Sequence, residues 1–190
     1  MLTPSPAALE FLSKRRSVTA KTLKSPGPDR AQIGELLEIA SRVPDHGKLE
    51  PWRFVVIEPE AQARYRDAAL TRLEALGQDE TARDKAAVIL SHGVPIVAVI
   101  FSPKPSQKIP LWEQEMAAAC VCLSLVNAGL AAGWGANWLS GPLCRDDVFL
   151  TGTLGCVEGE WVPGFIHLGT PQIAPAERDR PDTEALTTWL

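Results

Sequence analysis

The chain has 190 residues, a length that favours one domain over two and leaves no room for separate cofactor and substrate domains. Apolar residues make up 45% of it, so a hydrophobic core can hold the fold without disulfides or metal ions. Nineteen basic and twenty-three acidic side chains give a net charge of −4. That balance argues against a protein that wraps nucleic acid or docks on an anionic membrane.

The N-terminus has no apolar run behind a basic flank, so we expect a cytoplasmic protein without a targeting segment. No C-x-x-C pair occurs among the four cysteines, and we expect reduced, mostly buried thiols at Cys120, Cys122, Cys144 and Cys156. The histidines lie far apart in the sequence without ligand-spaced partners, so no metal site is expected at His46, His92 or His167.

In the N-terminal half, apolar spacing predicts a short helix over residues 8–15 that ends in the basic run Lys14-Arg15-Arg16-Ser17. After the break at residues 26–28, Asp29 is a candidate N-cap with Gln32 three residues later, and a helix is predicted to Val43. The turn residues 44–47 then lead into a predicted strand over residues 53–57.

Residues 58–85 carry twelve charges, a density typical of solvent-exposed helices. Further buried strands are predicted over residues 94–101, 136–140 and 164–168, with a helix over 145–154. Because strands and helices interleave along the chain, we expect a single domain over residues 1–190 in which helices cover both faces of one sheet.

A run of 29 residues without a charge, from Met116 to Cys144, belongs to a predicted long helix that begins near Leu111 and stops near Gly133. Its length alone would allow a membrane span. The many small residues, the polar Asn127 and Asn137 and the lack of a basic flank argue against that alternative. We therefore expect a helix buried inside the fold or in a dimer interface.

The tail over residues 174–190 is rich in proline and charge and closes on Trp189 and Leu190. A polar arm with an apolar tip suits docking on a partner subunit, for example on its sheet edge. A frayed terminus is the alternative that the sequence leaves open.

The chain carries no G-x-G-x-x-G turn, Walker A loop, nucleophile elbow or H-E-x-x-H helix. If the protein is an enzyme, we therefore expect a bound cofactor to carry out the chemical step. Two segments are dense in hydrogen-bonding side chains. Residues 14–17 place guanidinium groups and a hydroxyl at a helix end, which suits a phosphate, although a solvated basic patch is the plainer interpretation. Residues 42–52 form a polar turn between a helix and a strand.

The order of several short motifs resembles the nitroreductase family, most closely its short bacterial members, over nearly the whole chain. These motifs are Arg15-Arg16-Ser17-Val18, the Pro44 to Trp52 loop, Trp112-Glu-Gln-Glu-Met116, Gly133-Trp-Gly and Gly164-Phe-Ile-His-Leu-Gly169. The resemblance implies a three-layer α+β fold with a mixed sheet covered by helices. It also implies an intertwined homodimer that binds one FMN at each of two subunit interfaces.

Carried over residue by residue, the resemblance makes Arg15, Arg16 and Ser17 contacts of FMN, with the flavin lined from the same subunit by Trp138, Leu139 and Ser140. Arg42 and His46 would reach the FMN of the other subunit. The alternative for His46 is a turn histidine satisfied by nearby backbone. The positive side chains suit the phosphate and can stabilise negative charge on reduced flavin.

The same resemblance places the binding of the electron donor, NADH or NADPH, at a segment whose side chains offer few hydrogen-bond donors. Its residues are Ala128, Gly129, Leu130, Ala131, Ala132 and Gly133. Such residues are better suited to form a cavity wall or a dimer core than to bind a dinucleotide through side-chain hydrogen bonds. In the loop, Asp45, Lys48 and Glu50 stand where larger members of the family carry Ser, Asn and Gln. This departure concerns flavin hydrogen bonding and substrate preference.

The predicted activity is an FMN-dependent NAD(P)H oxidoreductase that reduces nitroaromatic or quinone-like acceptors, with donor and acceptor alternating at the flavin. No protein nucleophile is required, because the chemistry takes place at N5 of FMN. Two alternatives remain at this stage. One is a flavin carrier or sensor without significant turnover, and the other is a non-catalytic homodimeric interaction module.

Overall fold

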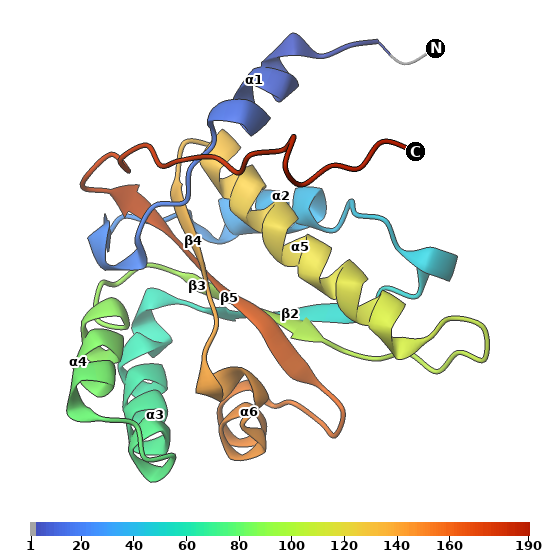
Figure 1. Cartoon of the computed structure of the whole chain (residues 1–190). Coiled ribbons are helices and arrows are strands. Elements are labelled where there is room, and N and C mark those ends of the chain that lie inside the picture. Colours follow the sequence, from blue (N-terminus) through green and yellow to red (C-terminus); the bar gives the residue numbers. More distant parts are fainter. Residues whose placement is uncertain (1–2) are drawn as a thin grey trace.

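The computed structural model describes residues 3–190. The chain forms one five-stranded sheet with helices on both faces (Figure 1). The strand order is β1-β5-β3-β2, and β4 pairs with β5 outside this order. The strands are β1 (Leu23–Lys24), β2 (Trp52–Ile57), β3 (Ile96–Phe101), β4 (Gly135–Leu139) and β5 (Trp161–Pro171). The expected three-layer α+β arrangement is confirmed.

Of the six α-helices, α1 projects away from the sheet and the others lie on its two sides (Figure 1). They are α1 (Pro6–Lys14), α2 (Arg30–Ala40), α3 (Gln62–Ala75), α4 (Glu80–Ile89), α5 (Leu111–Ala131) and α6 (Asp147–Leu154). Single 3₁₀ turns join them at η1 (Ala20–Thr22), η2 (His46–Lys48), η3 (Pro59–Ala61) and η4 (Pro142–Arg145). The helices α2 and α5 cover one face of the sheet, and α3 and α6 cover the other.

Alternation of side chains along the strands builds two hydrophobic cores, because successive residues of a strand point to opposite faces. Val97 and Val99 of β3 pack with Leu125 of α5 in the first core. Ala98 and Ile100 pack with the second, beside α3 and α6. The strand β3 is buried along its whole length, as the apolar run 94–101 predicts.

Local sequence signals place several boundaries correctly. Asp29 caps α2 in a complete capping box with Gln32, as predicted. The strand β5 is longer than the predicted strand over residues 164–168. It begins at Trp161, continues through Pro163 and ends at Pro171. The two-residue strand β1 has no counterpart among the predicted elements, since its pairing with the end of β5 is a long-range contact.

The sheet differs in one respect from the mixed sheet that the resemblance implied. All strand pairs within residues 3–190 run antiparallel. The long β5 accounts for this, because β1, β3 and β4 all pair with it and all run in the opposite direction. A parallel strand would have to come from outside these five.

The helix α5, which carries no charge from Met116 onward, is long and apolar enough to cross a bilayer by length and composition. Half of its apolar window is buried inside the fold, and core helices of soluble proteins pass the same test. Its residues Val121, Cys122 and Leu125 are fully buried against the sheet and α2. The helix therefore has a structural role that accounts for its lack of charge.

An ion pair fixes the start of β5. Arg53 of β2 donates from Nε and Nη2 to the two carboxylate oxygens of Glu160, at 2.8 and 2.6 Å. The backbone N–H of Val157 donates to the same carboxylate at 3.1 Å. The hydrogen bond from Arg53 is the main reason why the pKa of Glu160 falls to about 2. This pair ties the edge strand β2 to the loop that leads into the central strand.

We predict that Glu160→Gln lowers the free energy of unfolding at pH 7 by about 1.5–3 kcal/mol, the scale of a hydrogen bond to a charged group. Because the folded-state pKa lies below the ordinary value of 4.5, the carboxylate stabilises the fold above pH 4.5 and loses this effect as the pH falls toward 2. Urea unfolding between pH 3 and 7 should show the two proteins converging at low pH. Glu58→Gln, which removes the exposed partner of Arg30, is the control and should be nearly neutral. An equal effect of both changes at pH 7 would contradict the assignment.

Candidate functional site

The predicted contacts Arg15, Arg16 and Ser17 lie where the chain leaves α1 and runs alongside β4. The helix ends at Lys14, and the backbone N–H of its C-cap residue Arg15 donates to the carbonyl of Phe11. The backbone N–H of Val18 then donates to the carbonyl of Ala136 at 3.0 Å. In return, the side chain of Asn137 donates to the carbonyl of Val18 at 2.7 Å. These bonds bring the basic run to the beginning of β4.

The basic run borders a pocket of about 670 Å³, called here the basic pocket. Residues of α1, the end of α5, the start of β4 and the C-terminal segment line it, among them Lys14, Arg15, Arg16, Leu130, Gly135 and Glu177. Arg15 donates from Nη2 to the hydroxyl of Ser17 at 3.1 Å. Its Nε is buried and has no hydrogen-bond partner among residues 3–190. An unpaired guanidinium N–H next to a hydroxyl is a suitable donor set for an anion.

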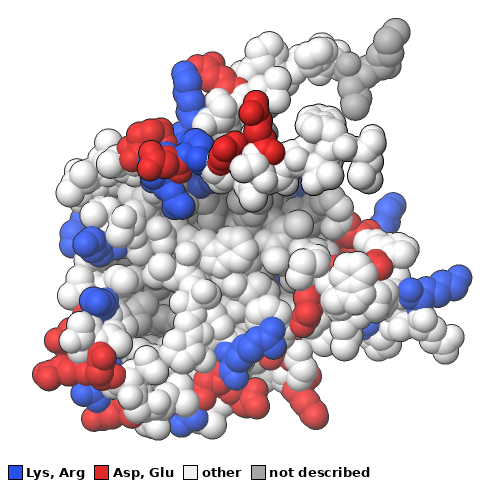
Figure 2. Space-filling view, in the orientation of Figure 1, with Lys and Arg blue, Asp and Glu red and all other residues white. Residues whose placement is uncertain are grey.

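The C-terminal segment adds charges to the basic pocket that the sequence did not single out. One carboxylate oxygen of Glu177 lies 3.1 Å from Nη1 of Arg16 and 3.1 Å from Nη2 of Arg180. Hydrogen bonds from the backbone of Arg178 and then from Arg16 lower the pKa of Glu177. Figure 2 shows mixed acidic and basic side chains in this region, at the upper left below α1. No local pattern could have found Glu177, because 161 residues separate it from Arg16.

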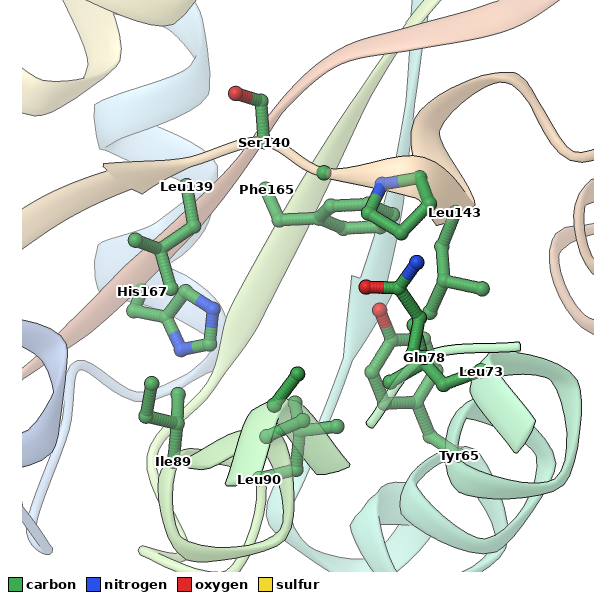
Figure 3. A pocket seen from close by; sticks show the side chains of 14 residues that line it. Tyr65, Leu73, Gln78, Ile89, Leu90, Leu139, Ser140, Leu143, Phe165 and His167 are labelled. Carbon is green, nitrogen blue, oxygen red and sulfur yellow. The ribbon is translucent and has the colours of Figure 1, made fainter. Parts of the chain in front are cut away.

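A second pocket, called here the apolar pocket, has a volume of about 300 Å³ and lies between α3, α4 and the loop that follows β4 (Figure 3). Its lining is almost entirely apolar, with few polar side chains. The residues that line it include Tyr65, Leu73, Gln78, Ala86, Ile89, Leu90, Leu139, Ser140, Phe165 and His167. Two predicted flavin contacts, Leu139 and Ser140, are thus at its wall. The hydroxyl of Ser140 points away from the centre of the pocket in Figure 3.

Trp138, the third predicted contact on β4, lies on the opposite face of the strand from Leu139, because side chains alternate. Its indole N–H donates to the carbonyl of Pro163 at 3.0 Å. The ring packs over Gly164, where a Cβ atom would collide with it. The side chain remains 37% exposed, so one part of the indole is available to a ligand or a partner subunit.

The strand β4 connects the two pockets. Gly135 at its start lines the basic pocket, and Leu139 at its end lines the apolar pocket. Four residue steps of extended chain span about 13 Å. The arrangement suits an elongated ligand that carries an anionic group at one end and a largely apolar ring at the other.

Arg42 and His46 lie elsewhere in the subunit. His46 belongs to η2, and its Nδ1 is 2.7 Å from a carboxylate oxygen of Glu113 in the first turn of α5. Glu113 and Leu130, which lines the basic pocket, are separated by 17 helical residues, or about 26 Å. The structure therefore does not bring His46 to the basic pocket of its own subunit. A reach to the site of another subunit stays a prediction.

Three residues of the Pro44 to Trp52 loop, Asp45, Lys48 and Glu50, differ from those expected in larger family members, and the structure shows how this chain holds the loop. A carboxylate oxygen of Asp45 accepts the backbone N–H of Glu50 at 2.7 Å. Lys48 and Glu50 both adopt left-handed backbone conformations, with φ of 53° and 50°. Asp45 thus stabilises a turn that other residue types would hold differently.

The segment predicted for the nicotinamide donor packs closely against the sheet. Ala128 and Gly129 are buried, and a Cβ at Gly129 would meet Leu168 and Ala136. The helix ends at Ala131, Ala132 follows as its C-cap, and Gly133 has a φ of +86°. Only Leu130 and Gly133 of this segment line the basic pocket. The binding of NAD(P)H by these residues stays a prediction.

Comparisons with known proteins agree on the family to which this arrangement is similar. The model of the nitroreductase family matches residues 12–170. An Escherichia coli K12 protein named "Putative NAD(P)H nitroreductase YdjA" is 36% identical over 184 residues, covering 96% of this chain and 99% of its own. A nitroreductase-like family protein from Bacillus cereus superposes with a TM-score of 0.81 at 23% identity, over 100% and 99% of the two chains. A nitroreductase with bound FMN from Bacteroides fragilis gives 0.74 at 20% identity, over 98% and 100%.

Proposed function

Because the chain belongs to the nitroreductase family, we propose that it is an FMN-dependent oxidoreductase that takes electrons from NADH or NADPH. The observation that supports this most directly is the pair of pockets joined by β4. FMN carries a phosphate at one end and a fused ring at the other. The relative from E. coli carries NAD(P)H in its name, and the neighbour from B. fragilis was solved with FMN.

The residues of the basic pocket fit the phosphate. The guanidinium group of Arg15 and the hydroxyl of Ser17, whose Nη2 and Oγ atoms lie 3.1 Å apart, can donate to phosphate oxygens. Arg16 can do the same once its exposed partner Glu177 moves aside, because an exposed ion pair of this kind is weak. At the other end of β4, Leu139 and Ser140 offer the ring a wall.

When bound, FMN supplies the hydride chemistry at N5 of its ring. The protein's own task is to orient the ring, keep water from one face and balance the charge of the reduced form. The proposed acceptors are nitroaromatic or quinone-like compounds that follow the oxidised donor into the same space. No side chain of the protein is assigned a nucleophilic or acid–base role.

We propose that the protein is a homodimer in the cytoplasm. Large apolar side chains are exposed on α1, α2 and α5, including Leu9, Leu12, Ile39, Trp112, Met116 and Leu123. Exposed apolar surface on three adjacent helices is typical of an interface. A second copy there would also bring its Arg42 and His46 toward the site, and the exposed Trp189 of the tail suits docking on the partner. Four free cysteines suit a reducing compartment.

The function itself is tested by an absorbance spectrum of the purified protein before and after anaerobic addition of NADH or NADPH. We predict a yellow protein whose flavin band is bleached by the nucleotide. A protein that stays yellow but turns over with no acceptor would instead be a carrier or sensor. A colourless protein that takes up no added FMN would be the non-catalytic module, and it would overturn the proposal.

For the phosphate site, Arg16→Ala should weaken FMN binding to the apo-protein by about 10- to 150-fold. This corresponds to roughly 1.5–3 kcal/mol, the range for a charge-assisted hydrogen bond. Fluorescence titration with FMN measures the affinity. Arg64→Ala, on the exposed side of α3, is the control and should bind like the unmodified protein. Unchanged affinity in Arg16→Ala would contradict the assigned role.

The dimer is tested by Leu123→Glu, which places a charge in the exposed apolar surface of α5. Burying an unpaired carboxylate costs several kcal/mol, so the variant should sediment as a monomer and retain FMN poorly. Val148→Glu makes the same change on α6, on the other side of the sheet, where the residue is 65% exposed. This control should leave the sedimentation coefficient unchanged. A dimeric Leu123→Glu variant would show that this face is not the interface.

A further inference from the structure

Glu113 is the hydrogen-bond partner of His46, one of the two side chains expected at the FMN of the other subunit. One carboxylate oxygen of Glu113 lies 2.7 Å from Nδ1 of the imidazole. The sequence left open a bond to nearby backbone, whereas the structure shows a side chain 67 residues further along the chain. The side chain of His46 is 63% exposed and that of Glu113 only 29%. His46 thus projects outward from a partner that the fold covers.

Both members of this pair are attached to one anchored loop. Glu113 lies in the first turn of α5, next to Gln114, which is only 2% exposed. The side chain of Gln114 accepts the backbone N–H of Lys104 at 2.9 Å and donates to the carbonyl of Lys104 at 3.1 Å. Gly47, in the same turn η2 as the histidine, packs against Ile109 of that loop, since a Cβ at Gly47 would collide with its Cδ1 atom. The turn and the start of α5 are therefore held together.

The contact with Glu113 decides which nitrogen of His46 is left for a ligand. An ionised carboxylate can only accept hydrogen bonds, so Nδ1 carries the proton. A hydrogen bond at one ring nitrogen sets the tautomer and the orientation of the imidazole. Within residues 3–190, Nδ1 is the only nitrogen of this ring with a hydrogen bond. Nε2 is therefore the nitrogen available to a ligand.

The exposed side of α5 indicates how this nitrogen meets FMN. Exposed residues follow one another three or four positions apart along the first half of the helix, at Trp112, Met116, Cys120 and Leu123. Most homodimers have a two-fold axis. An axis across α5 near Leu123 reverses the second helix, so the start of each α5 lies opposite the end of the other. The end of α5 lies beside α1 and lines the basic pocket through Leu130 (Figure 1).

We propose that Glu113 is a positioning residue of the flavin site, whose hydrogen bond to Nδ1 turns Nε2 of His46 toward the FMN bound by the other copy. This inference rests on the proposed FMN function and on the proposed dimer. A side chain that is already held in place loses less freedom when it binds a ligand, so it contributes more to affinity. In this role Glu113 acts only through His46.

A double-mutant cycle tests this dependence. The affinity for FMN is measured by fluorescence titration of the apo-protein for Glu113→Ala, His46→Ala and the double variant. We expect Glu113→Ala to weaken FMN binding about two- to tenfold, the effect of one hydrogen bond. The double variant should bind FMN no more weakly than His46→Ala alone. Additive losses, or an unchanged affinity in either single variant, would overturn the proposal while leaving FMN binding intact.

Glu113→Gln separates the positioning role from a structural one. Its amide oxygen can still accept the hydrogen bond from Nδ1, so this variant should keep most of the affinity for FMN. A carboxylate in the first turn also interacts favourably with the helix dipole, and Glu113→Gln and Glu113→Ala lose that effect alike. Equal losses of FMN affinity in these two variants would therefore overturn the proposal. Glu113→Leu replaces Glu113→Ala if the latter does not fold.

Asp147→Ala is the matched control, because it removes an exposed carboxylate from the first turn of α6, on the other side of the sheet. Its affinity for FMN should equal that of the unmodified protein, and a loss as large as that of Glu113→Ala would overturn the proposal. Failure of the unmodified protein to bind FMN would instead overturn the proposed function.

Discussion

The antiparallel pairing of β5 with its neighbours is the constraint on which the rest of the structure depends. Three strands, β1, β3 and β4, pair with β5, and all of them run in the opposite direction. The pairing of β4 places Leu139 opposite Phe165 and Asn137 opposite His167. From Asn137, one further hydrogen bond fixes the chain at Val18 and hence the basic run before it. The two pockets are thus held at opposite ends of one short strand, without a separate binding domain.

Charge and polarity are distributed accordingly. The chain is acidic overall, yet three adjacent cationic side chains, Lys14 to Arg16, outnumber the two carboxylates, Glu10 and Glu177, that line the same pocket. Electrostatic attraction of a phosphate needs only this local excess, because surface charges beyond about 8–10 Å are screened at physiological ionic strength. The apolar pocket carries no charged side chain. A subunit of this size can therefore offer two chemically different environments to one ligand.

Much of the fold followed from local signals. The cap at Asp29, the buried run of β3 and the long helix α5 were predicted from residue types and spacing alone. The signals failed where structure depends on distant partners. Strand β1 exists only because residues near 170 pair with it, and Glu177 meets Arg16 only through the folded C-terminal segment. Likewise, the apolar pocket at Leu139 and Ser140 could not be predicted from local patterns, because five separate elements of the chain form it.

A crystal structure of the protein with FMN tests the central claim most directly. The account predicts a phosphate bound by Arg15, Arg16 and Ser17, a ribityl chain along β4 and a ring against Leu139 and Ser140. It further predicts Glu177 displaced from Arg16. Density for FMN at another surface, or a ring turned so that its phosphate lies away from the basic pocket, would contradict it.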